Sequence, residues 1–411
     1  MAFYGPREIA SVMKVLLRGE LARYHTTKKS EVSKFEDELA AFMGTSYALG
    51  LNSGTSAIIC ALIGAGVGPG DEVLVPAYTW VSDAAAPLAI GAVPVLVEVD
   101  DTLMMDPKDI RRKITPYTKA IIPVHMLNLV CDMDAIMAIA NEHKLVVIED
   151  ACQAVGVKYK GRRVGSIGHA GVFSFQQHKN IEAGEGGGLV TNDERIFTRA
   201  GMYHDVGSYT RKDRRQTDEP VFSGMNFRMP ELIAALLRPQ LKTLDRQLEN
   251  RKAQRRAIIK RLSALTPSRH NDPENACGVT FTFDDPEDAK EFGKAPGVNV
   301  LIETGRHVYT NWQTILGMHP AHPKLDPYKW TQRKIEQTKE QCPKTLEILA
   351  RTCNVKLLPH VPNLAYRAAI EMMARHAKPR ARVATTSASK QNGAGRASPE
   401  HLRPSSPAER L

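Results

Sequence analysis

Between residues 47 and 193 the chain alternates short apolar runs with segments of helical periodicity. The apolar runs are YALGLN, DEVLVPAYTW, AVPVLVEVD, KAIIPVH, KLVVIED, GVFSF and GGLVTND. This alternation predicts an α/β fold with a mainly parallel sheet covered by helices, and it places any chemistry at the carboxyl ends of the strands. The side chains at those ends that could bind a ligand are Trp80, His125, Asp150 and Ser174.

The remainder of the chain predicts a second, smaller domain. Residues 230–262 have the spacing of a long helix, which Pro239 is expected to kink or divide. Beyond it, GVTFTFDD and VKLLP are typical of strands, and two further stretches are typical of helices, which gives an α+β arrangement. The expected organisation is a large α/β domain, a small C-terminal α+β domain and a tail, over residues 1–245, 246–376 and 377–411.

The positive charge is concentrated in the tail. From Arg375 onward there are eight basic and two acidic residues, which account for six of the ten net positive charges. This segment is rich in Pro, Ser, Ala and Gly and poor in large apolar residues, so it is expected to be disordered. We do not expect nucleic-acid binding, but a non-catalytic sensor or a nucleic-acid-binding protein using this tail is the alternative from a different functional class.

Other sequence signals bear on the compartment. No apolar run approaches the roughly 18 residues of a membrane span, and the N-terminus lacks the features of a secretory signal, so we expect a cytoplasmic protein without membrane contact. The six cysteines are scattered without CxxC pairs, which favours reduced thiols and predicts neither a disulfide framework nor a metal site.

Two glycine-containing segments need to be distinguished. GAGVGPGDE, residues 64–72, follows a helical pattern and precedes a strand, so it is interpreted as a turn and not as a dinucleotide fingerprint. NSGTSA, residues 52–57, has the order strand, turn and helix, which suits a phosphate at the helix N-terminus near the hydroxyls of Ser53, Thr55 and Ser56. The same residues could instead cap the helix.

Asp150 and Lys179 are two charged residues that could bind a ligand together with the NSGTSA turn. Asp150 ends an apolar strand, where a buried carboxylate needs a partner such as a protonated ring nitrogen, or else caps a helix. Lys179 lies between FSF and GEGGG, and a lysine in such a rigid site can act as a nucleophile, although a solvated charge is the simpler interpretation. Together with Trp80 and the phosphate turn, these residues supply the four contacts that pyridoxal 5'-phosphate requires.

The chain resembles the sugar aminotransferases of the DegT/DnrJ/EryC1/StrS family, which are fold-type I pyridoxal-phosphate enzymes. The matching stretches run in the family's order over about residues 1–260. They are NSGTSA, GPGDEVLVPAYTWV, AIGAVPVLVEVD, PVHMLNLVCDMDAI, VVIEDACQAVGVKYKGRRVGSIG, FSFQQHKNIEAGEGGGLVTND and GMNFRMPELIAALLRPQL.

This resemblance implies specific roles for individual residues. Lys179 would form the Schiff base with the cofactor as catalytic residue, and Asp150 would pair with the pyridine nitrogen. Trp80 would stack on the ring and Gln153 would contact the ring hydroxyl. The implied phosphate contacts are Gly54, Thr55, Ser56 and Ser174, with Asn226 reaching the phosphate of the partner subunit in a homodimer.

The resemblance also implies amino transfer from glutamate or glutamine to a keto-sugar, keto-cyclitol or related ketone, in amino-sugar, antibiotic or cell-surface polysaccharide biosynthesis. Some relatives are sugar dehydratases with a histidine at the lysine position, so His178 beside Lys179 leaves a dehydratase as an alternative. Two positions depart from the family pattern: Asn128 replaces a usual glycine and His169 a usual aspartate. The expected substrate residues are His125, Asn128, Glu185, Arg306, His307 and Tyr309.

Overall fold

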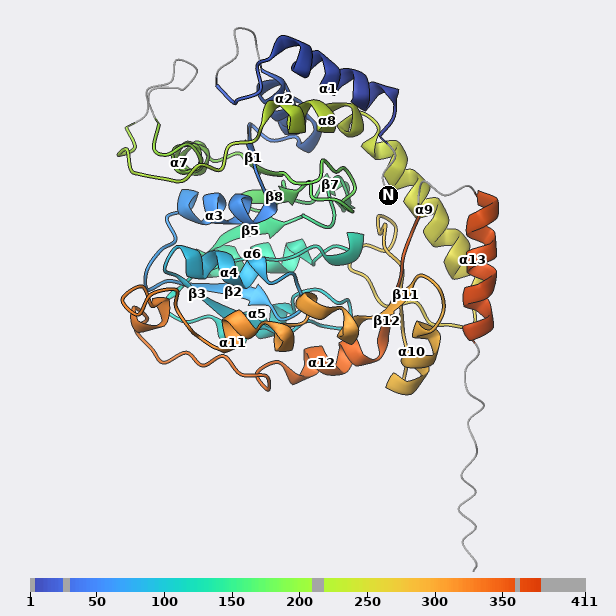
Figure 1. The fold of residues 1–411 in the computed structure, drawn as a ribbon. Helices are drawn as coiled ribbons and strands as arrows, with labels where there is room; N and C mark the ends of the chain where they lie inside the picture. Colours follow the sequence, from blue (N-terminus) through green and yellow to red (C-terminus); the bar gives the residue numbers. More distant parts are fainter. Residues whose placement is uncertain (1–3, 25–29, 209–217, 359–362, 378–411) are drawn as a thin grey trace, which may run out of the picture. The chain divides into compact units, whose positions relative to one another are not determined.

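The computed structural model describes residues 4–24, 30–208, 218–358 and 363–377 (Figure 1). The predicted tail lies outside these ranges from residue 378 onward.

A seven-stranded sheet forms the centre of the described chain. In sheet order the strands are β3 (Val93–Val97), β2 (Glu72–Pro76), β4 (Thr118–Ile121), β5 (Val146–Asp150), β8 (Ala170–Ser174), β9 (Gly187–Thr191) and β1 (Tyr47–Leu51). The first five pair in parallel, whereas β9 runs antiparallel to both β8 and β1. Each predicted apolar run therefore contains a strand, and the prediction of a mainly parallel sheet is confirmed.

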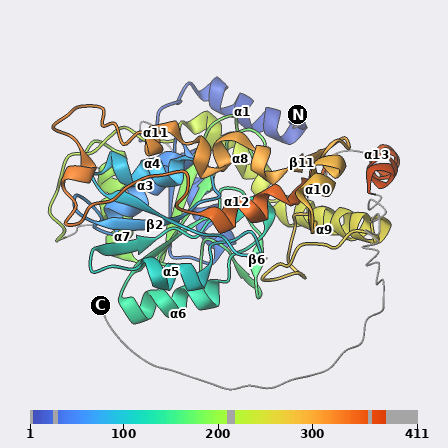
Figure 2. The same cartoon turned by 90° about the horizontal axis from the view of Figure 1, so that it is seen from below.

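Helices cover both faces of this sheet. The order of the strands puts α3 (Gly54–Gly64) and α4 (Ser82–Ala89) on one face, and α5 (Pro107–Lys113) and α6 (Met133–His143) on the other (Figure 2). The helix α7 (Glu194–His204) packs on α3. Strands such as β3 are buried along their whole length, which explains why their sequences are continuously apolar.

The N-terminal helices pack against a helix from the middle of the chain. Both α1 (Pro6–Arg18) and α2 (Glu31–Met43) contact α8 (Glu231–Leu241), which α9 (Leu244–Arg261) follows (Figure 1). Pro239 lies inside α8, so the expectation that it divides the helix is wrong in position. One missing backbone donor does not end α8, and the division falls just after it, at Lys242 and Thr243.

A three-stranded antiparallel sheet has its own apolar cluster. Its strands are β10 (Thr280–Thr282), β12 (Thr352–Val355) and β11 (Val298–Val300), and α10 (Pro286–Gly293) and α13 (Asn363–His376) pack nearby. The predicted strand VKLLP is displaced, because β12 ends at its first residue. The remaining short elements are β6 (Lys158–Tyr159), β7 (Arg162–Arg163), α11 (Gln313–Leu316) and α12 (Pro343–Ala350). The domain boundary at residues 245 and 246 stays a prediction.

Among the described residues, no helix has the length and apolar composition that crossing a membrane requires.

Candidate active site

A cavity of about 810 Å³ lies at the carboxyl ends of the central strands. Eleven of the residues predicted from the sequence line it: Gly54, Thr55, Trp80, Asn128, Asp150, Gln153, Ser174, Lys179, Glu185, Arg306 and His307. Residues 354–358, at the end of β12 and directly after it, also line the cavity. The cavity is therefore lined both from the edge of the central sheet and from the C-terminal part of the chain.

The NSGTSA turn forms one end of the cavity. Ser53 caps α3, since its Oγ accepts a hydrogen bond from the Ser56 amide at 3.1 Å, and the Ser56 hydroxyl donates to Asn52 Oδ1 at 2.7 Å. Thr55 Oγ1 lies 2.8 Å from Ser82 Oγ, and both side chains line the cavity. The sequence left capping and anion binding open, and the turn has residues for both, because capping occupies Ser53 and Ser56 while Thr55 faces the cavity.

Glycine is required where this turn meets neighbouring strands. A Cβ added to Gly54 would lie 2.9 Å from the Ser174 Cβ, and one added to Gly187 would lie 2.1 Å from the Ser53 carbonyl oxygen. The second contact is with backbone, which a rotamer change cannot relieve. The glycines of the GEGGG segment thus let β9 approach the turn at the start of α3.

Lys179 and Asp150 reach the cavity from adjacent strands. Asp150 ends β5, is 5% exposed, and accepts a hydrogen bond from the Cys152 amide at 2.7 Å. Lys179 follows β8 and is half-buried. Its ammonium group has no ion pair or hydrogen bond among the described residues, which leaves it available to a ligand. The preceding residue, His178, has a left-handed backbone (φ 85°) and donates its amide hydrogen to Glu182.

Trp80 contacts two residues of the C-terminal region that also line the cavity. The Trp80 ring is 38% exposed, with the His307 ring centroid 5.2 Å away and the Arg306 guanidinium 4.5 Å above it. His307 Nδ1 donates to the Thr304 carbonyl oxygen, so its Nε2 accepts from the Gln153 amide at 3.3 Å. Burial lowers the pKa of His307, which favours this neutral form.

Asn128 has a backbone conformation that favours glycine. Its backbone φ is 59°, in the left-handed region where asparagine is better tolerated than most residues with a side chain. Its Oδ1 accepts a hydrogen bond from Asn180 Nδ2 at 2.6 Å. The departure therefore keeps the backbone conformation and adds a polar side chain to the cavity wall.

The structure places four predicted site residues away from the cavity lining. His125 is fully buried and its Nε2 bonds Glu149 at 3.1 Å, while Ser56 is 6% exposed. Tyr309 is buried and its hydroxyl donates to the Lys339 carbonyl oxygen. Asn226 is exposed in this single chain. His169, the other departure from the family pattern, accepts a hydrogen bond from the Val147 amide at 3.0 Å.

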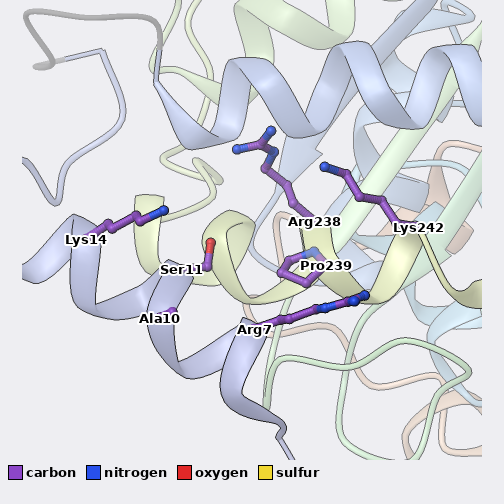
Figure 3. Close-up of a pocket in the computed structure, with 7 residues that line it drawn as sticks. All are labelled: Arg7, Ala10, Ser11, Lys14, Arg238, Pro239 and Lys242. Atoms are coloured by element: carbon purple, nitrogen blue, oxygen red, sulfur yellow. The ribbon is translucent and has the colours of Figure 1, made fainter.

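A second cavity of about 460 Å³ lies between α1 and α8 (Figure 3). It is lined by Arg7, Ala10, Ser11, Lys14, Arg238, Pro239 and Lys242. Arg238 already pairs with Glu31 and Glu38. None of the predicted site residues lies here, so the larger cavity is the candidate active site.

A family model described as the DegT/DnrJ/EryC1/StrS aminotransferase family matches residues 6–374. The chain belongs to this family. It is 38% identical over 283 residues to the spore coat polysaccharide biosynthesis protein SpsC of Bacillus subtilis strain 168, an alignment that covers 66% of this chain and 72% of that protein. It is 40% identical over 247 residues to the L-glutamine:2-deoxy-scyllo-inosose aminotransferase of Micromonospora echinospora, covering 58% of each.

The family's fold extends over most of the chain. The aminotransferase from Psychrobacter cryohalolentis superposes with a TM-score of 0.74 at 27% identity, covering 90% of this chain and 96% of that one. The resemblance stated from the sequence and the fold-type I architecture are therefore both confirmed.

Sequence analysis missed several residues that line this family site. They are Asp83, Cys152, Asn180, Arg251 and Lys356. Asp83 is 1% exposed, and in the sequence it resembles an ordinary acidic residue in the first turn of a helix. Arg251 belongs to a charged helix whose other basic residues do not line the cavity, and the sequence had no signal that separated it from them.

Proposed function

We propose that this protein is a pyridoxal-phosphate-dependent aminotransferase that moves an amino group from glutamate or glutamine to a ketone on a sugar, a cyclitol or a related ring. The observation that carries the proposal is the convergence of Lys179, Asp150, Trp80 and the start of α3 on one cavity. Membership of an aminotransferase family supports the reaction type.

The residues present fit the cofactor. The first amides of α3 lie at the turn where Gly54 leaves room beside Ser174, and amides at a helix N-terminus suit a phosphate. Thr55 and Ser82 add hydroxyl groups. The Trp80 face and the buried Asp150 carboxylate would hold the ring and its nitrogen.

The chain's own groups have separate tasks in the reaction. Pyridoxal phosphate, when bound, supplies an aldehyde that takes up the amino group and a ring that accepts an electron pair. Lys179 would hold the aldehyde carbon and then move a proton to and from the reacting carbon. Asp150 would keep the ring nitrogen protonated. The neutral His307 would fix Gln153 at the edge of the ring.

Basic residues in the cavity lining support an amino donor that carries a carboxylate. Arg251, Arg306 and Lys356 line the cavity, and burial lowers the pKa of Arg251. Arg251 has no carboxylate partner among the described residues, so a donor carboxylate would satisfy it. The relative from Micromonospora echinospora, named for L-glutamine and a cyclitol ketone, supports this substrate class.

A homodimer with shared sites is part of the proposal. Asn226 is exposed and its backbone pairs with Asp205. Its Oδ1 accepts a hydrogen bond from the Arg228 amide at 3.4 Å, so the group we propose for contact with a second subunit is its Nδ2. The resemblance implies that this residue would reach the partner's phosphate.

The test is spectroscopic. Purified protein supplied with pyridoxal phosphate should acquire a visible band, lose it when glutamate or glutamine is added, and regain it with an accepted ketone. A protein that binds no cofactor contradicts the proposal.

A sugar dehydratase is the second candidate, because His178 lines the same cavity as Lys179. The position of Lys179 between SF and GEGG supports it as the counterpart of the family's lysine. We expect Lys179→Ala to abolish amino transfer and the visible band, whereas His178→Ala should retain both. Loss of turnover in His178→Ala together with full turnover in Lys179→Ala would favour the dehydratase.

A further inference from the structure

Asp83 is a second buried carboxyl group beside Asp150. It lies in the first turn of α4, is 1% exposed and lines the candidate active site. The charged or titratable groups that face it are Asp150 at the end of β5, Cys152 in the following loop, and Lys179 after β8. The site thus holds two acids close together, of which the proposed mechanism uses one.

The two oxygens of Asp83 have unequal surroundings. Thr79 Oγ1 donates to Oδ2 at 2.5 Å. Oδ1 is buried and has no hydrogen-bond partner among the described residues. An ionised carboxylate with such an oxygen is costly, whereas a protonated one becomes a donor and needs only an acceptor. The Asp150 carboxyl group lies within hydrogen-bonding reach and provides that acceptor.

The electrostatics agree with this arrangement. Burial, and then the charge of Asp150, raise the pKa of Asp83 well above its usual range. The Thr79 hydrogen bond and the Lys179 charge act in the opposite direction, as does the N-terminus of α4. Burial is the largest of these effects, because the side chain has lost nearly all contact with water.

We propose that Asp83 is a protonated acid that donates a hydrogen bond to Asp150 and thereby orients that carboxylate towards the cofactor's ring nitrogen. The orientation rests on the proposed function, but the shared proton does not. Since the Cys152 amide occupies Asp150 Oδ1, two donors would hold the carboxylate in one plane. Asp83 is therefore a positioning residue.

A shared proton makes folding depend on pH. A carboxyl group whose pKa is raised by folding stabilises the folded protein at low pH, and this contribution is lost as the pH rises through the folded-state pKa. Between about pH 5, where an unfolded aspartate is ionised, and the folded-state pKa, the unfolding equilibrium constant should therefore rise by about tenfold per pH unit for this one proton.

The decisive experiment compares full-length apoproteins by urea unfolding across pH. Asp83→Asn keeps the size of the side chain and a hydrogen-bond donor but does not titrate. The slope of its unfolding free energy against pH should therefore differ from that of wild type by about one proton. Asp109→Asn is the matched control, because it removes a buried aspartate whose Oδ2 accepts from the Glu98 amide and whose Oδ1 pairs with Arg112. Equal slopes of unfolding free energy against pH in wild type and Asp83→Asn would overturn the proposal that Asp83 and Asp150 share a proton.

Two further measurements keep the proposal testable if a variant folds poorly. Infrared difference spectra of the wild-type apoprotein should show a protonated carboxyl group that is lost on raising the pH, and its absence contradicts the proposal.

Asp83→Ala should weaken pyridoxal phosphate binding by about tenfold, with Asp83→Asn close to wild type. Equal affinity in both variants contradicts the positioning role. If wild type binds no cofactor, the proposed function fails. The pH dependence of the unfolding free energy would still test whether Asp83 and Asp150 share a proton.

Discussion

At the scale of residues, the candidate site combines a few groups with no protein partner and many that are fully satisfied. The Lys179 ammonium and the Arg251 guanidinium have no acidic partner among the described residues, whereas Glu149, equally near the sheet edge, accepts hydrogen bonds from His125 and from the amides of Ile167 and Gly168. Unsatisfied charges beside a cavity indicate ligand contacts, and satisfied ones indicate structural roles.

Arg251 offers a direct test of donor recognition. Arg251→Gln removes a charged donor from the cavity wall, and loss of a hydrogen bond between charged groups should raise KM for glutamate or glutamine by about tenfold to a hundredfold. Arg255→Gln is the control, because Arg255 donates to the Gly278 carbonyl oxygen and does not line the cavity. Steady-state kinetics would measure both, and equal KM values in the two variants would count against a donor contact.

Asn128 tests acceptor recognition. Asn128→Gly keeps the left-handed backbone and removes the amide that Asn180 holds, so we expect kcat/KM for ketone acceptors to change by about tenfold while the visible cofactor band is unchanged. Lys144→Gly is the control for glycine at a left-handed position, since Lys144 follows α6 with φ 57°. Identical acceptor kinetics in Asn128→Gly and wild type would exclude this side chain from specificity.

At the scale of elements, the start of α3 and the first residue of β9 are in backbone contact. Gly187→Ala would force them apart, because its Cβ would lie 2.1 Å from the Ser53 carbonyl oxygen. We expect loss of about 1–3 kcal/mol of unfolding free energy and weaker pyridoxal phosphate binding.

Gly68→Ala is the matched control for this prediction. A Cβ at Gly68 has no atom within 4 Å, so thermal denaturation and cofactor titration should resemble wild type. If Gly187→Ala bound the cofactor as well as Gly68→Ala, the contact between strand and turn would not shape the phosphate site.

At the scale of the whole molecule, the proposed dimer makes each site depend on two subunits. Mixing Lys179→Ala with Asn226→Asp chains should restore activity, because one site of each heterodimer then carries both substitutions and the other carries none. An equal mixture should reach about a quarter of wild-type activity. Sedimentation should show that each variant alone is a dimer. A mixture no more active than the separate variants would contradict an active site shared between subunits through Asn226.

The sequence predicted the central sheet well because its strands are continuous apolar runs between turn residues. It did not predict β11, whose residues Val298–Val300 are too few to form a pattern.

Side-chain contacts were harder to predict than strands. His125 and Asp150 both lie at the carboxyl ends of apolar runs, but only the fold shows that Glu149 binds the His125 side chain. Asp83 was missed because its environment comes from β5 and β8, far along the chain.

The pairing of β1 with β9 has a consequence for how the protein is made. Leu51 lies opposite Gly187, so the phosphate turn is completed only after a ribosome has delivered the residues of β9. Before that point, the amides at the start of α3 lack the neighbouring strand that shapes the turn. A nascent or prematurely terminated chain should therefore ignore pyridoxal phosphate even where Asp150 and Lys179 are already synthesised, and cofactor capture should be a late event that stabilises only the completed fold.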